Sequence, residues 1–133
     1  WLAMPVFSRG SRGMTTYNAR EEADALIIGF DDPAGLNDFR NSTLRDSLYE
    51  LVQTRTQPFL AIDLLQIDYL SSSGLAILVG IKRRVETRLG KIVLFHVQPT
   101  VLDILKVTKL DRYFTVAQDE HSALASLHPV PAL

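Results

Sequence analysis

The stretch that decides the fold is "AIDLLQIDYLSSSGLAILVGIKRR", residues 61–84. It begins with a short apolar segment typical of a buried strand, passes three consecutive hydroxyls at Ser71–Ser73, and continues with the apolar spacing of a helix. A Ser at such a junction can accept hydrogen bonds from the first free N–H groups of the helix, which contributes about 1 kcal/mol. The same junction leaves neighbouring hydroxyls exposed, so a capping role and a chemical role are compatible here.

Strand and helix patterns alternate on both sides of this stretch. We expect strands at 23–30, 59–65, 91–97 and 113–117, with 15–19 as a further candidate, and helices at 37–55, 73–89, 99–108 and 119–127. Asn37 or Asp38 would cap the first of these helices, and Gly90 would adopt the left-handed conformation just past the second. Such alternation indicates an α/β domain with a largely parallel sheet of four to five strands.

Composition limits the classes of function. The chain has 133 residues, which suits one domain, and its net charge of −1 provides no basic surface for nucleic acid. It has no cysteine, which excludes disulfides and thiolate metal sites and is compatible with the cytoplasm, where we expect the protein. The longest charge-free apolar stretch, 74–81, is far shorter than the roughly 20 residues of a membrane helix. We therefore expect no nucleic-acid binding and no membrane insertion.

The two ends differ in composition from the rest. Residues 1–13 contain "SRGSRG" and are expected to form a flexible leader, with Met4 or Met14 as the natural start and part of the leader a candidate for added sequence. The domain is expected to occupy 14–128, and 129–133 to form a tail.

Few residues suggest enzymatic chemistry. The histidines at 96, 121 and 128 lack metal-ligand spacing, and the glycines form neither a dinucleotide fingerprint nor a P-loop, so we expect no metal and no cofactor. The Ser triplet is not a GxSxG elbow, which leaves serine hydrolysis as the weakest hypothesis. The acidic loop 31–35 is explained by turn-forming residues, although cation binding is an alternative. The basic run of 82–88 is explained as a solvated helix face.

Residues 61–84 resemble the STAS domain of bacterial anti-sigma-factor antagonists. Ile62–Leu64 match the family's strand, Ser72–Leu75 match its Ser-Ser-Gly-Leu switch, and Gly80 matches the second glycine of its helix, without a gap. Downstream, "LGKIVLFHVQPTVLDILKVTKLDRYF" is similar to the family's next strand, its Pro-x-Val helix and its Thr-Gly-Leu ending. The resemblance covers roughly residues 24–127, and it implies a small mixed sheet with about four helices mainly on one side.

The resemblance also implies a function without catalysis. An unphosphorylated antagonist binds an anti-sigma serine/threonine kinase, which supplies the ATP, and thereby releases a sigma factor; phosphorylation ends this binding and a phosphatase restores it. Ser72 occupies the phosphoacceptor position. Ser71, Ser73, Gly74 and Leu75 would form the switch loop and helix cap, and Asp31, Asp32 and Ile77 would contact the partner.

Two residues depart from the family pattern. Ser71 stands where the family has Asp, which removes a carboxylate from the switch and makes Ser71 an alternative acceptor. Lys109 stands where the family has Gly, and a side chain in a left-handed conformation costs about 1 kcal/mol. The loss of the carboxylate also motivates a second hypothesis, a non-switching interaction module such as a stressosome scaffold or a transporter accessory subunit.

Overall fold

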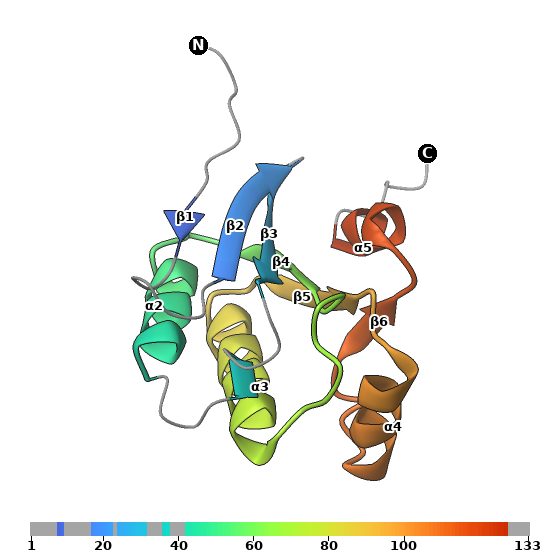
Figure 1. Cartoon of the computed structure of the whole chain (residues 1–133). Helices are drawn as coiled ribbons and strands as arrows, with labels where there is room; N and C mark the ends of the chain where they lie inside the picture. The colour runs from blue at the N-terminus through green and yellow to red at the C-terminus, as the bar shows by residue number, and fades with distance from the viewer. Residues whose placement is uncertain (1–7, 10–16, 23, 32–35, 38–41, 128–133) are drawn as a thin grey trace.

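The computed structural model describes residues 8–9, 17–22, 24–31, 36–37 and 42–127 of the chain (Figure 1). The described strands are β1 (Ser8–Arg9), β2 (Tyr17–Glu22), β3 (Ala25–Phe30), β4 (Phe59–Asp63), β5 (Lys91–Phe95) and β6 (Thr115–Ala117). The helices for which bounds are defined are α2 (Ser42–Gln53), α3 (Ser72–Thr87), α4 (Pro99–Val107) and α5 (Glu120–Leu127).

All the described strands belong to one mixed sheet. Their order across the sheet, β1-β2-β3-β4-β5-β6, is also their order along the chain. β1 and β2 pair antiparallel, as do β2 and β3, whereas β3 to β6 run parallel. The expected α/β architecture is therefore confirmed. One detail differs from expectation, because Ser8 and Arg9 lie in the expected flexible leader yet pair with β2 as a two-residue edge strand.

The placement of the helices follows from the strand order. Each parallel connection moves one strand further in the same direction, and such connections are right-handed, so the connecting helices α2, α3 and α4 fall on one face of the sheet. α5 follows the last strand and packs against β4, β5 and β6 from the opposite face (Figure 1). Most of the helical mass thus covers one side, as expected.

The two faces of the sheet bury different side chains. Leu26, Ile28, Leu60 and Ile62 belong to the larger apolar cluster, beneath α2, α3 and α4. The residues between them in sequence, such as Ile27 and Ala61, belong to a smaller cluster that α5 covers. Because side chains alternate along a strand, central strands buried on both faces have continuous apolar runs. This explains why "LIIGF" and "FLAI" lack alternation.

The end of α3 differs from the prediction. The left-handed residue is Leu89, with φ of 59°, and not Gly90. Glycine at position 90 has another cause: a Cβ there would lie 1.9 Å from the carbonyl oxygen of Pro58, which accepts the Lys91 N–H at 2.9 Å. The glycine therefore allows the chain entering β5 to approach the chain entering β4. At Lys109, by contrast, the expected left-handed conformation is present, with φ of 63°.

Candidate functional site

The Ser triplet lies where β4 leads into α3, at the end of the sheet where the parallel strands terminate. Ser71 is the N-cap of α3: its backbone is extended, and its Oγ accepts a hydrogen bond from the Gly74 N–H at 3.1 Å. Its carbonyl oxygen accepts from Leu75 N at 2.9 Å, the first bond of the helix. The expected cap is thus Ser71, the residue that stands in place of the family's Asp.

Asn37 holds this cap from the connection after β3. Its Oδ1 accepts the Ser71 N–H at 2.7 Å, and its Nδ2 donates to the carbonyl oxygen of Tyr69 at 2.8 Å. The Ser71 hydroxyl is directed at two oxygens of Asn37, the carbonyl at 3.0 Å and Oδ1 at 3.1 Å. We refer to this set of contacts among Asn37, Tyr69, Ser71 and Gly74 as the Asn37 latch. Asn37 was predicted to cap the next helix, but α2 begins at Ser42 and the Asn37 side chain bonds to the α3 loop instead. The other predicted cap, Asp38, lies outside the described residues.

The serines differ in accessibility. Ser72 is exposed at the first position of α3, whereas Ser71 and Ser73 are half-buried. Gly74 is buried, and a Cβ there would lie 2.4 Å from Asn37 Oδ1, so the latch requires glycine at this position. Leu75 is half-buried against the larger core cluster. Among the residues predicted for the switch, Ser72 thus has the most exposed hydroxyl.

The predicted partner contacts differ in their exposure. Ile77 is only 5% exposed and is part of the larger core cluster, so the assignment of Ile77 to a partner surface is wrong. It lies on the side of α3 that faces the sheet. Asp31 is exposed just after β3, where its carboxylate accepts from Asn18 Nδ2 at 3.4 Å. Asp32 lies outside the described residues.

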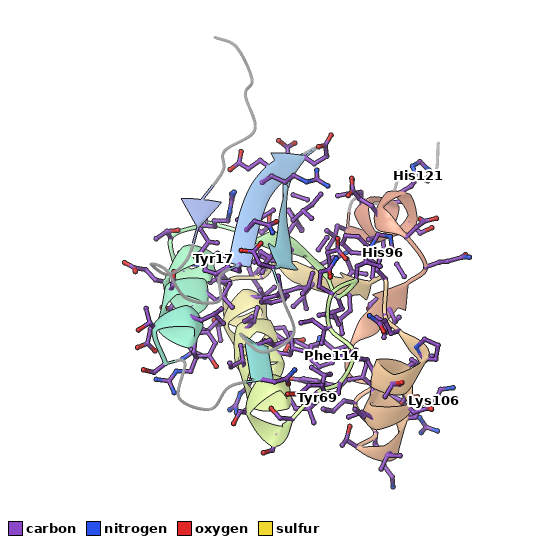
Figure 2. All side chains as sticks on the ribbon, in the orientation of Figure 1. Tyr17, Tyr69, His96, Lys106, Phe114 and His121 are labelled. Carbon is purple, nitrogen blue, oxygen red and sulfur yellow. The ribbon has the colours of Figure 1, made fainter. Side chains whose placement is uncertain are left out.

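A polar cleft and two apolar side chains surround this end of the sheet. The cleft, of about 370 Å³, is lined by residues of β2, β3 and β4 and by residues that directly follow β3 and β4, among them Asp31, Asp63 and Gln66. Leu65 and Tyr69, in the loop before α3, are 52% and 47% exposed. Tyr69 is labelled in Figure 2. Tyr69 belongs to the Asn37 latch through its carbonyl oxygen, and an exposed aromatic side chain in the same loop as an exposed serine is suited to contact with another protein.

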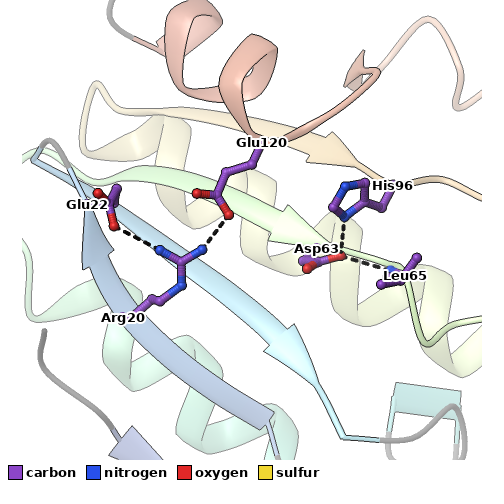
Figure 3. A network of polar contacts seen from close by, with 6 residues as sticks. All are labelled: Arg20, Glu22, Asp63, Leu65, His96 and Glu120. Carbon is purple, nitrogen blue, oxygen red and sulfur yellow. Dashed lines mark hydrogen bonds and ion pairs between the residues drawn. The ribbon is translucent and has the colours of Figure 1, made fainter.

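Asp63 and His96 form a separate polar contact at the ends of β4 and β5 (Figure 3). Asp63 Oδ1 lies 3.0 Å from His96 Nδ1 and also accepts the Leu65 N–H at 2.9 Å. His96 has a positive φ of 54°, so the carboxylate holds a ring whose backbone is in an uncommon conformation. In the same figure, Arg20 of β2 pairs with Glu22 and with Glu120 of α5, which joins this helix to β2.

Within the ranges that the structure describes, no group of three or more His, Cys, Asp or Glu residues could hold a metal ion. Nor does any helix among these residues have the length and apolarity needed to span a membrane.

The STAS domain profile matches residues 16–123 of the chain. The chain belongs to the STAS domain family. Solved structures of similar fold include an anti-sigma-factor antagonist (STAS) domain protein from Planctomyces limnophilus, 20% identical, with a TM-score of 0.74 over 84% of this chain and 97% of that one. An anti-sigma factor antagonist from Mycobacterium paratuberculosis is 18% identical, with a TM-score of 0.71 over 89% and 97% of the two chains. The antagonist SpoIIAA in its unphosphorylated form is 15% identical, with a TM-score of 0.67 over 96% and 100%.

The motif glycines of this STAS domain have separate structural causes. Gly74 accommodates Asn37, and Gly80 accommodates Tyr49 of α2, whose hydroxyl would lie 2.1 Å from a Cβ at position 80. The ring of Tyr49 is in turn covered by the Arg84 guanidinium at 3.7 Å from its centroid. Sequence reasoning missed the role of Asn37, since the two ends of the latch are 34 residues apart. A polar residue directly after the apolar Leu36 was the one available signal.

Proposed function

We propose that this STAS domain is an anti-sigma-factor antagonist. In its unphosphorylated state it binds a cognate anti-sigma serine kinase and so releases a sigma factor, and phosphorylation of Ser72 ends the binding. The protein acts in the cytoplasm, holds no cofactor and catalyses no reaction in this scheme. The kinase binds the ATP, and a phosphatase restores the free hydroxyl.

The observation that carries the proposal is the contrast between the first two serines. The Ser71 hydroxyl is engaged by Asn37 and Gly74, whereas Ser72 is exposed on the first turn of α3. A kinase must bring the acceptor hydroxyl into its own active site, so an exposed side chain at a corner of the fold is the favoured substrate.

The charge that a phosphoryl group would add at the start of α3 supports the proposed switch. A phosphoryl group adds about −1.5 to −2 charges at neutral pH. The N-terminus of a helix tolerates such a charge, because its dipole and free N–H groups favour anions. The described first turn of α3 contains no acidic side chain that would repel it. The new charge would therefore act mainly on a partner docked over Ser72 and Tyr69.

The test is phosphorylation of the full chain with ATP and an anti-sigma serine kinase from the same genome, followed by peptide mass spectrometry. The proposal predicts one phosphoryl group on the peptide that contains residues 71–73. If that peptide stays unmodified while the kinase phosphorylates its own known substrate, the switch is refuted.

Binding measurements test the consequence of the modification. Ser72→Ala should bind the kinase as tightly as the unmodified protein does, and Ser72→Asp should bind more weakly because it places charge in the interface. Calorimetry with purified kinase measures both. Equal affinities would show that this corner of the domain does not contact the kinase.

The replacement of the family's switch Asp by Ser71 favours a second candidate, a non-switching interaction module. Such a module would act in a stressosome-like scaffold or beside a transporter. A pull-down from native extract separates the two: a kinase and a sigma factor support the switch, and a large scaffold or a transporter ATPase supports the module.

A further inference from the structure

The Ser triplet presents three hydroxyls within three residues, and a kinase that docks on this corner meets more than one of them. The structure gives a reason why they are not equivalent. Ser71 Oγ is used twice, as the acceptor for Gly74 N–H and as the donor toward the oxygens of Asn37. Ser72 lies outside this arrangement and is exposed.

Asn37 is the centre of the arrangement. It is 8% exposed, and it is the one buried polar or charged residue of the described chain. Both polar atoms of its side chain are used, Oδ1 by Ser71 and Nδ2 by the carbonyl oxygen of Tyr69. A buried amide with its bonds made is costly to displace, because each partner would be left without a bond inside the protein.

We propose that Asn37 selects the phosphoacceptor: by holding the Ser71 hydroxyl inside the latch, it directs the phosphoryl group to Ser72. This inference rests on the proposed function. In the transfer, Ser72 Oγ forms a bond to the γ-phosphorus of ATP while the bond from that phosphorus to the bridging oxygen of ADP breaks. ADP leaves with the electron pair, and the hydroxyl proton passes to a base of the kinase.

Transfer to Ser71 would require the latch to open. The Ser71 hydroxyl would have to leave Asn37 and give up the Gly74 N–H, which would remove the cap of α3. Space is also restricted, because the backbone of Gly74 approaches Asn37 so closely that a single added carbon would lie 2.4 Å from Oδ1. A phosphoryl group is much larger than one carbon. Asn37 is therefore a positioning residue, which acts through Ser71 and does not itself touch ATP.

The experiment compares four full-length proteins, the wild type, Asn37→Ala, Asn37→Asp and Ser72→Ala. Each is incubated with the kinase and ATP, and tandem mass spectrometry assigns the phosphoryl group to Ser71, Ser72 or Ser73. The wild type should carry it on Ser72. Asn37→Ala frees the Ser71 hydroxyl, and the ratio of Ser71 to Ser72 phosphate should rise by about tenfold, the factor that corresponds to the loss of one buried hydrogen bond.

Asn37→Asp distinguishes an effect on the choice of phosphorylated serine from an effect on the stability of the fold. Asn37→Asp retains a side-chain oxygen that accepts from Ser71 N–H and Oγ–H but loses the donor to the Tyr69 carbonyl oxygen, so it should keep the preference for Ser72 although it loses stability. If Asn37→Ala does not fold, Ser72→Ala tests the same inference. With the latch intact, its phosphorylation should fall by at least about tenfold and should not move to Ser71.

The outcomes separate this inference from the proposed function. Phosphate on Ser71 of the wild type, or its transfer to Ser71 in Ser72→Ala at the wild-type rate, overturns selection by Asn37 and leaves the phosphoswitch standing. An unchanged site ratio in a folded Asn37→Ala protein overturns it as well. Absence of phosphate from all four proteins overturns the proposed function and the selection with it.

Discussion

Replacement of Gly80 by Ala tests how α2 and α3 are packed. A Cβ at position 80 would lie 2.1 Å from Tyr49 Oη, 2.7 Å from Cζ and 3.1 Å from Cε1. The whole ring would therefore have to move, and the Arg84 guanidinium, 3.7 Å from the ring centroid, restricts that movement.

Two opposing terms set the magnitude. Overpacking of a well-packed contact costs about 1–3 kcal/mol, and the number and shortness of these contacts place Gly80→Ala at about 2–3 kcal/mol. Alanine is favoured over glycine inside a helix by about 1 kcal/mol. The net destabilisation expected is about 1–2 kcal/mol. In a Tyr49→Ala background the clash is absent and the helix term remains, so the same substitution should stabilise the protein by up to about 1 kcal/mol.

Urea unfolding followed by circular dichroism gives the free energy of unfolding of the four proteins in this double-mutant cycle. The expected result is a change of sign between the two backgrounds. Equal effects of Gly80→Ala in both backgrounds, or a more stable single variant, would refute the packing argument.

Three further predictions concern the caps and the close approach. Ser71→Ala removes the cap and leaves the Gly74 N–H without its acceptor, and should lower the free energy of unfolding in urea by about 1–2 kcal/mol, with Ser72→Ala as the matched control within about 0.5 kcal/mol; equal losses would contradict the assignment of the cap. Gly90→Ala places a Cβ 1.9 Å from the Pro58 carbonyl oxygen and should be more destabilising than Leu89→Ala, whose side chain is 79% exposed; a thermal shift assay compares the two, and equal melting temperatures would argue against the close approach. Hydrogen bonds from the Ser122 N–H, and secondly from the Ser122 side chain, lower the pKa of Asp119 below its ordinary value of 3.8. The ionised Asp119 carboxylate therefore contributes its full stability above pH 3.8, and this contribution is lost as the pH falls through the lower pKa of the folded state. Urea midpoints measured down to about pH 2 should fall less steeply for Asp119→Asn than for the wild type, and parallel curves would contradict this.

Local patterns predicted most of the fold. The strands β3 to β6, the last three helices and the layered α/β arrangement follow from apolar period, from Pro99 at a helix start and from the resemblance around the Ser triplet. The bounds of β5 and α4 differ from expectation by two residues or fewer at each end. The features that predict these two elements, their apolar spacing and Pro99, lie within the elements themselves.

The errors fall where a distant segment decides the local structure. Gly90 was assigned a left-handed backbone because it follows a helix, but the cause of the glycine is Pro58, 32 residues earlier. Asn37 was assigned to a neighbouring helix, but its partners lie at 69–71. Ile77 was assigned to the partner surface, but its side chain is buried in the larger core cluster. Position along the chain does not carry this information.

The candidate site shows the same division. That one Ser caps the helix while a neighbour is exposed could be expected from the junction of strand and helix. Which Ser caps α3 depends on contacts with Asn37, and Asn37 lies 34 residues before Ser71, outside the pattern around the triplet.

The identical order of the strands in the chain and in the sheet has a consequence for synthesis. As the chain leaves the ribosome, each new strand from β3 onward finds the edge it pairs with already translated, so the sheet can grow in one direction without waiting for a later segment to insert. The smaller apolar face, however, remains uncovered until α5 emerges at the end. α5 thus covers a surface that every shorter nascent chain exposes.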